Sequence, residues 1–139
     1  LSNFIKSDSL YEFVLKKSPE NTIVLNNYSY YLSLRKQNLN KAKEMSKKAN
    51  ELDPNNGTFQ DTYAWILYQN QEYQEAKKWI EKAISNSAIA SPVIIEHYGD
   101  ILYRLDEPEA ALIQWEKALS LGSESQFLLQ KIKDKILYE

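Results

Sequence analysis

The chain has 139 residues, about the size of one domain, and its composition excludes several protein classes. Three glycines and four prolines are too few for the many tight turns of a β-sandwich or barrel, so we expect helices joined by short turns. The absence of cysteine excludes disulfides and thiolate chemistry, and a single histidine excludes a histidine-rich metal cluster.

The charge balance excludes two further classes of partner. With 17 basic and 19 acidic residues the net charge is −2, so no positive field attracts nucleic acid and we expect no nucleic-acid partner. The uncharged stretches are short: 83–95, for example, has 13 residues and includes polar ones, so we expect no membrane insertion by this segment. The chain begins at Leu1 without a signal sequence, which suggests a soluble segment of a longer protein; its localisation stays open between cytoplasm and periplasm or envelope.

Local signals predict a series of helices along the chain. Asn21 or Thr22 can cap the second helix, Ser91 followed by Pro92 is a favourable helix start, and Gly122 can end a helix. The predicted helices cover 3–17, 22–36, 40–52, 58–69, 73–85, 92–105, 109–121 and 125–138.

The same residue types recur at a nearly fixed interval. The interval is 35 and 35 residues for Tyr28, Tyr63 and Tyr98, and 34 and 35 residues for Ala42, Ala76 and Ala111. A period of this length with two apolar helices per unit indicates a helical solenoid. Single-residue insertions fall before Ala42 and before Tyr98, where we expect turns that tolerate them.

These residues resemble the tetratricopeptide repeat family, in the style of its bacterial members. The family places a large and a small residue together on a first helix, and alanines around a bulky residue on a second. The third unit reads Ile95, Tyr98, Gly99, Leu102, Ala111, Trp115 and Ala118; the second reads Gln60, Tyr63, Ala64, Leu67, Ala76, Ile80 and Ala83; the first reads Leu25, Tyr28, Ser29, Leu32, Ala42, Ser46 and Ala49. Gln60 and Ser46 depart from the pattern because they stand at large apolar positions.

The resemblance implies an all-α, right-handed α-solenoid of antiparallel helix pairs, in which three units lie between an N-terminal orphan helix and a C-terminal capping helix. We expect a single domain over 1–139, in which 1–20 is the second helix of a partial preceding repeat. Residues 22–56, 57–91 and 92–123 are then repeats 1 to 3, and 124–139 is the capping helix. Its apolar face would carry Leu128, Leu129, Ile132 and Ile136, and its solvent face Lys131, Lys133, Asp134 and Lys135.

No residue pattern indicates catalysis. The chain lacks a glycine-rich phosphate loop and a Ser-His-Asp set, and its only imidazole, His97, is expected to be a partly exposed helix residue. Residues 53–57 lack the later glutamate of a calcium loop and are expected to form a turn. We therefore expect no enzyme activity, no cofactor and no metal site.

In tetratricopeptide proteins the first helices line a concave groove that holds an extended or helical peptide, so the resemblance also implies a partner site. The positions carried over are Asn26, Tyr30, Ser33, Asp61, Thr62, Trp65, Tyr68, Gln69, Glu96, His97, Asp100, Tyr103 and Arg104. The set is aromatic and acidic, which favours a protein or peptide partner with a basic or apolar segment. The alternative is that Tyr30, Trp65 and Tyr68 only pack against neighbouring helices.

Two functions follow from this interpretation. The first is a non-enzymatic protein–protein interaction scaffold that binds a peptide or helix of a partner, with Trp65, Tyr68 and Tyr103 as main contacts. The alternative is a structural or assembly module that self-associates as a homo-oligomer or spaces other domains of a larger envelope-associated protein. Clamping of a terminal carboxylate, as in chaperone-binding members, is disfavoured because the corresponding positions are Asn26, Tyr30, Thr62, Val93 and His97, without lysine or arginine.

Overall fold

The structure is a computed structural model that describes residues 2–87, 89 and 91–139. Within these residues it contains eight α-helices and no strand: α1 (Ser2–Lys17), α2 (Thr22–Leu34), α3 (Leu39–Leu52), α4 (Gly57–Gln69), α5 (Tyr73–Ser85), α6 (Pro92–Arg104), α7 (Pro108–Ser120) and α8 (Leu128–Asp134). The first seven begin and end within two residues of the predicted bounds.

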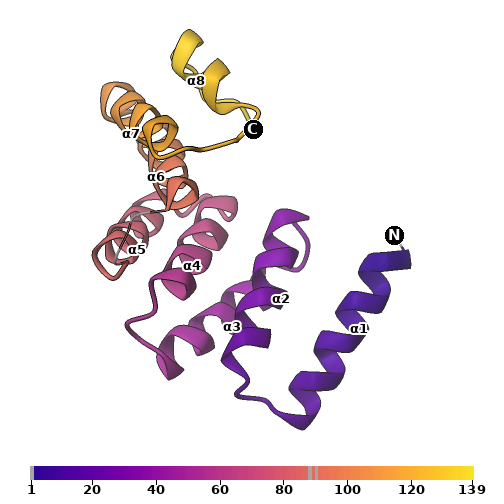
Figure 1. Ribbon diagram of the computed structural model, residues 1–139. Coiled ribbons are helices and arrows are strands. Elements are labelled where there is room, and N and C mark those ends of the chain that lie inside the picture. Colours follow the sequence, from indigo (N-terminus) through magenta and orange to yellow (C-terminus); the bar gives the residue numbers. More distant parts are fainter. Residues whose placement is uncertain (1, 88, 90) are drawn as a thin grey trace.

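The helices form a curved stack of pairs. α2 packs with α3, α4 with α5 and α6 with α7, while α3 contacts α4 and α5 contacts α6, so that each pair covers the next (Figure 1). α1 lies against α2 at one end and α8 against α7 at the other. This arrangement confirms the expected all-α solenoid, whose stability comes from stacking because one pair cannot bury its apolar face alone. The exact repeat boundaries stay a prediction.

Side chains of the repeat pattern form the core. The pattern alanines of the second helices, such as Ala42, Ala76 and Ala111, are fully buried. Gly99 allows a close approach, because a Cβ atom at this position would lie 2.5 Å from two indole atoms of the fully buried Trp115. A glycine here therefore lets α6 and α7 approach each other across the tryptophan.

The two polar departures from the pattern are both buried. Gln60 is 2% exposed, donates to the Pro54 carbonyl at 2.9 Å and accepts a bond from the Asn86 amide at 3.0 Å. Ser46 is fully buried, and its hydroxyl has no partner. Gln60 thus replaces apolar packing with satisfied hydrogen bonds.

Helix starts follow the local signals. The side chains of Asn21 and Ser91 accept hydrogen bonds from the amides three residues on, at 3.1 and 3.2 Å, which confirms both predicted caps. Asn56, which is not among the predicted caps, accepts the equivalent bond at the start of α4, also at 3.1 Å.

The first helix of each pair ends in the same turn. Lys36, Gln71 and Asp106 adopt left-handed φ angles of 53°, 62° and 59°. In each turn the residue's own N–H donates to the carbonyl three residues before it, and the next N–H donates five residues back, at 2.8 to 3.2 Å. This is a Schellman motif. Gly122 makes the same bonds after α7 with a φ of 91°, which confirms its expected role.

The C-terminal helix differs from the expectation. α8 spans seven residues, beginning at Leu128 rather than 125 and ending at Asp134 rather than 138. Lys131, expected in solvent, is 3% exposed, whereas Leu129 and Ile136, expected to be buried, are 64% and 47% exposed. The predicted division of this helix into an apolar inner face and a charged outer face is therefore wrong, because Lys131 is buried by its ion pairs with Glu96 and Asp100 on α6. No helix in the described ranges combines the length and apolarity that a membrane span requires.

Candidate interaction groove

The residues expected to line the groove lie on α2, α4 and α6, and they differ in accessibility. Asn26, Tyr68, Glu96 and Asp100 are buried, at 9% exposure or less. The half-buried members are Tyr30, Asp61, Trp65, Gln69 and Tyr103, and Arg104 is exposed. The half-buried group and Arg104 are therefore the part of the predicted set that a partner can reach directly.

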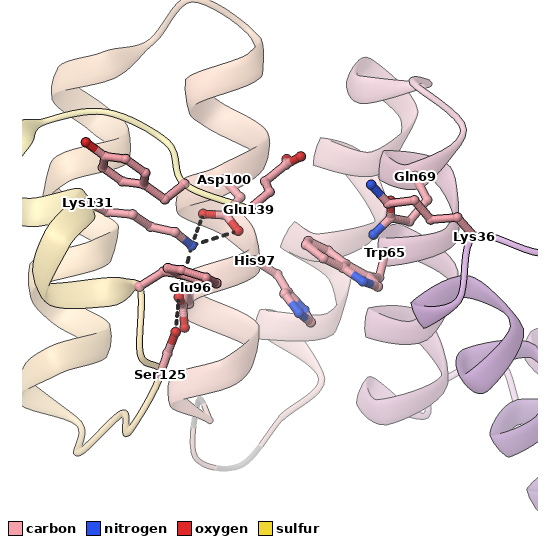
Figure 2. A pocket seen from close by; sticks show the side chains of 11 residues that line it. Lys36, Trp65, Gln69, Glu96, His97, Asp100, Ser125, Lys131 and Glu139 are labelled. Carbon is pink, nitrogen blue, oxygen red and sulfur yellow. Dashed lines mark hydrogen bonds and ion pairs between the residues drawn. The ribbon is translucent and has the colours of Figure 1, made fainter. Parts of the chain in front are cut away.

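An aromatic stack joins α4 to α6. The Trp65 ring lies between those of Tyr68 and His97, with centroids 4.6 Å and 3.9 Å away and interplanar angles of 11° and 18°. Figure 2 shows Trp65 and His97 facing each other across the two helices. Both expected roles of Trp65 are thus compatible with the geometry: it packs on a neighbouring helix, and it lines a cavity described below.

His97 is paired with a carboxylate on the neighbouring repeat. Its Nδ1 lies 2.9 Å from Oδ1 of Asp61, and the side chain is buried, so the expected partial exposure is wrong. Burial alone would lower the pKa of His97, but the nearby charges of Asp61, Asp100 and Glu96 outweigh it, and the pKa is raised above 6.5. When His97 is protonated, the attraction between its imidazolium and the Asp61 carboxylate therefore links α6 to α4.

Two buried polar atoms of the predicted groove residues, one of them in the aromatic stack, have no hydrogen-bond partner. They are Nε1 of Trp65, a donor, and Oδ1 of Asn26, an acceptor, and both atoms are inaccessible to solvent. Unpaired buried polar atoms are uncommon and costly, about 1–3 kcal/mol each. Tyr30, one turn after Asn26 on α2, has its pKa raised by burial and by the charge of Asp61.

A lysine from α8 neutralises the acidic end of the groove. The Lys131 ammonium lies 3.0 Å from Glu96 and 2.9 and 3.2 Å from the two oxygens of Asp100 (Figure 2). Asp100 also accepts a bond from Trp115 Nε1 at 2.9 Å, and Glu96 accepts one from the Ser125 hydroxyl at 2.8 Å. Burial raises the pKa of the Asp100 carboxyl, although Lys131 and Trp115 oppose this.

The chain end returns to the middle of the stack. The Tyr68 hydroxyl donates to the Glu139 carboxylate, and the Arg104 guanidinium lies 3.1 Å from the same carboxylate. Figure 1 shows the segment after α8 running back from the end of the solenoid toward the inner helices. Residues 123–139 thus cover Tyr68 and the acidic pair, two parts of the predicted binding set.

A cavity remains between this segment and the inner helices. Its volume is about 320 Å³. It is lined by Lys36, Trp65, Gln69, Glu96, His97, Asp100, Ser125, Phe127, Lys131, Tyr138 and Glu139. Five of these eleven residues were expected to line the groove, whereas Lys36 and the five C-terminal residues were not. The sequence contains a signal for one of the six, since Lys131 lies three residues after Leu128 and so shares its helical face.

The described residues offer little for catalysis. They include no group of three or more histidine, cysteine, aspartate or glutamate side chains positioned to hold a metal ion. The charged side chains of the groove pair with one another, His97 with Asp61 and Lys131 with Glu96 and Asp100.

Comparison with known proteins finds a family model that matches part of the chain. Residues 24–56 and 60–88 match the tetratricopeptide repeat family model. A TPR repeat-containing protein of Pseudomonas aeruginosa is 29% identical over 72 residues, which are 52% of this chain and 12% of the relative. The chain therefore spans a small part of that relative's length.

Solved structures show the same fold at low sequence identity. MamA superposes with a TM-score of 0.78 and 21% identity over 96% of this chain and 77% of its own. YrrB, described as a TPR protein with an unusual peptide-binding site, superposes with a TM-score of 0.74 and 22% sequence identity. The match covers 90% of this chain and 63% of YrrB. The first TPR of Spaghetti (RPAP3), bound to an HSP90 peptide, superposes with a TM-score of 0.74 and 15% sequence identity. The match covers 84% of this chain and 90% of that domain.

Proposed function

Because the chain contains tetratricopeptide repeats, a fold that serves protein–protein interaction, we propose that it is a non-enzymatic scaffold whose groove binds a peptide or helix of a partner protein. The observation that carries the proposal is the half-buried Trp65, which is stacked on Tyr68 and His97 and lines the cavity. Tryptophan is enriched among the residues that dominate binding energy, because it offers a large and rigid contact area.

A rigid aromatic wall favours binding of a segment in a fixed orientation. Trp65 is held by Tyr68 and His97, so little side-chain entropy is lost when a partner contacts it. Lys36 and Gln69 lie on the same cavity wall and supply polar contacts around the ring. These features support a partner segment with an apolar side chain flanked by backbone carbonyls.

The experiment selects peptides on the wild-type chain from a phage-displayed library and measures their affinity by isothermal titration calorimetry. Trp65→Ala should weaken the selected peptides at least tenfold, because a central tryptophan contributes about 2 kcal/mol or more to binding. Circular dichroism checks that the variant is folded.

Trp79→Ala is the matched control. Trp79 lies on α5, packs edge-on against Tyr63 with centroids 4.7 Å apart, and is not among the residues lining the cavity. Its removal should leave peptide affinity within about twofold. Equal affinity of the wild-type and Trp65→Ala chains for every selected peptide would contradict the assignment of the groove.

A second candidate function is self-assembly, favoured by one observation. On α1 the apolar side chains of Phe4, Ile5, Leu10 and Phe13 are 52–65% exposed, which leaves an apolar face at one end of the stack. Light scattering over a range of concentrations tests it: a homo-oligomer that is lost in Leu10→Lys would favour the assembly function, and a monomer at all concentrations would reject it.

A further inference from the structure

We propose that the carboxylates of Glu96 and Asp100 form a receptor for a lysine ammonium group, which Lys131 occupies in the free chain and a lysine of the partner segment occupies in the complex. The proposal deepens the proposed function, on which it rests, by naming the chemistry of the partner. It also implies that residues 123–139 leave the groove when the partner binds.

The site matches the hydrogen-bonding capacity of an ammonium group. Lysine has three N–H donors, and Nζ of Lys131 has three carboxylate oxygens within 3.2 Å, one from Glu96 and two from Asp100. The exposed fractions of the three side chains are 4%, 11% and 6%, so these charge-assisted bonds are shielded from water. The Trp115 ring, 5.9 Å from Nζ, adds a cation–π contact.

The receptor is held in place by α6 and α7 rather than by the ligand alone. Glu96 and Asp100 lie one turn apart on α6, and the Trp115 indole N–H fixes Asp100 from α7 at 2.9 Å. Two ionised carboxylates one turn apart repel each other, so a cation at this site stabilises both of them. The carboxylates belong to the solenoid, and a lysine of any polypeptide with access can supply the cation.

The segment that supplies Lys131 buries few apolar side chains. Of the seven residues of α8 only Leu128 and Lys131 are buried, and Phe127, Leu129 and Ile136 are 40–64% exposed. Segments with few buried apolar contacts open at the lowest free-energy cost. Residues 123–139 are therefore the part of the groove wall that a competing segment displaces most readily.

The geometry also selects lysine over arginine. A compact ammonium on a four-carbon stem fits three oxygens at 2.9–3.2 Å, whereas a planar guanidinium needs a flat fork of acceptors. Leu128, fully buried three residues before Lys131, indicates that the partner lysine follows an apolar residue by one helical turn. The adjoining cavity of about 320 Å³ gives room for the next side chain of the partner beside Trp65.

The test uses a fluorescein-labelled synthetic peptide with the sequence of residues 122–139 as the probe. It is added to the full chain carrying Lys131→Ala and Leu128→Ala, whose own segment can no longer fill the receptor, and binding is followed by fluorescence anisotropy. We expect this chain to bind the probe at least tenfold more tightly than the wild-type chain does, because its attached segment competes less.

Matched probes separate lysine recognition from general attraction. Peptides with Gln or with Arg in place of Lys131 should bind the doubly substituted chain at least tenfold more weakly than the lysine peptide. Equal binding of the lysine and glutamine peptides, or equal binding of the probe by the two chains, would overturn the proposal.

A measurement on the wild-type chain decides the case if the doubly substituted chain is unfolded. Hydrogen exchange followed by mass spectrometry should show faster exchange of residues 128–134 when the lysine probe is in excess, and no change with the glutamine probe. Unchanged exchange with both probes would reject displacement. Library peptides that depend on Trp65 but do not compete with the lysine probe would leave the groove function intact and reject the lysine receptor alone.

Discussion

Gly99→Ala provides the sharpest test of how the third helix pair is packed. The added Cβ would lie 2.5 Å from Cδ1 and Nε1 of Trp115, against 3.4 Å or more in ordinary contact, so the indole must move by about 1 Å. Trp115 is fully buried, and its N–H is bonded to Asp100, so a shift breaks packing and weakens a charge-assisted hydrogen bond. The third repeat pair should therefore be destabilised despite the better helix propensity of alanine.

The expected magnitude follows from three opposing contributions. Overpacking of a core costs about 1–3 kcal/mol. A weakened hydrogen bond to a charged group adds up to about 1.5 kcal/mol. Alanine in place of glycine inside a helix stabilises the folded chain by about 0.5–1 kcal/mol, which offsets part of this loss. The free energy of unfolding should fall by about 2 kcal/mol, measured by urea denaturation followed by circular dichroism.

A double-mutant cycle with Trp115→Phe identifies the cause. The smaller ring removes the indole atoms nearest the new methyl group, so Gly99→Ala should cost at least about 1 kcal/mol less in the Trp115→Phe background than in the wild type. Equal costs in the two backgrounds would refute the clash as the source of the effect. A stabilising Gly99→Ala would refute the close packing of α6 on α7.

Three further predictions use the same unfolding assay. Lys131→Ala should lower the free energy of unfolding by about 3–5 kcal/mol, because it leaves two buried carboxylates without a cation; a loss under about 1 kcal/mol would contradict the buried ion pair. The raised pKa of His97 means that its pair with Asp61 stabilises the fold fully below pH 6.5 and progressively less as the pH rises through the raised value. His97→Gln should therefore cost more at pH 6 than at pH 9, and the opposite order would reject the assigned shift. Ser91→Ala should cost about 1 kcal/mol through loss of the α6 cap, whereas a neutral result would show that Pro92 suffices.

Features with short-range causes could be predicted from the sequence. The caps at Asn21 and Ser91 and the turn at Gly122 depend on bonds within five residues, and each is found where the residue types indicate. The repeat spacing predicted the pairs because each unit buries the same alanines, such as Ala76. The extra residue of the first unit lies in the turn over 35–38, which is one residue longer than the turn over 70–72.

Features that depend on contacts between distant residues could not be predicted in this way. Lys131 was expected in solvent because lysine is rarely buried, but its partners Glu96 and Asp100 are 35 and 31 residues away. His97 has its partner, Asp61, 36 residues away. Periodicity identifies which helix face points inward, but it contains no information on which charges meet there. The residues expected to line the groove on α6 do belong to that helix, but their pairing became visible only in three dimensions, and their role in binding stays a prediction.

The three Schellman turns that follow α2, α4 and α6 give the molecule a set of equivalent positions for attaching labels. Lys36, Gln71 and Asp106 occupy the same turn position at intervals of 35 residues, are all exposed, and carry side chains that are positive, neutral and negative. Their backbone bonds, not their side chains, define the turn, so the side chains can be exchanged without disturbing the buried alanines. Because the chain contains no cysteine, and because Gln71 and Asp106 do not line the cavity, one cysteine at each of these two positions would carry a pair of spectroscopic labels one helix pair apart. The distance between labels along the edge formed by these turns would therefore measure how far the stack bends or opens when a partner is added.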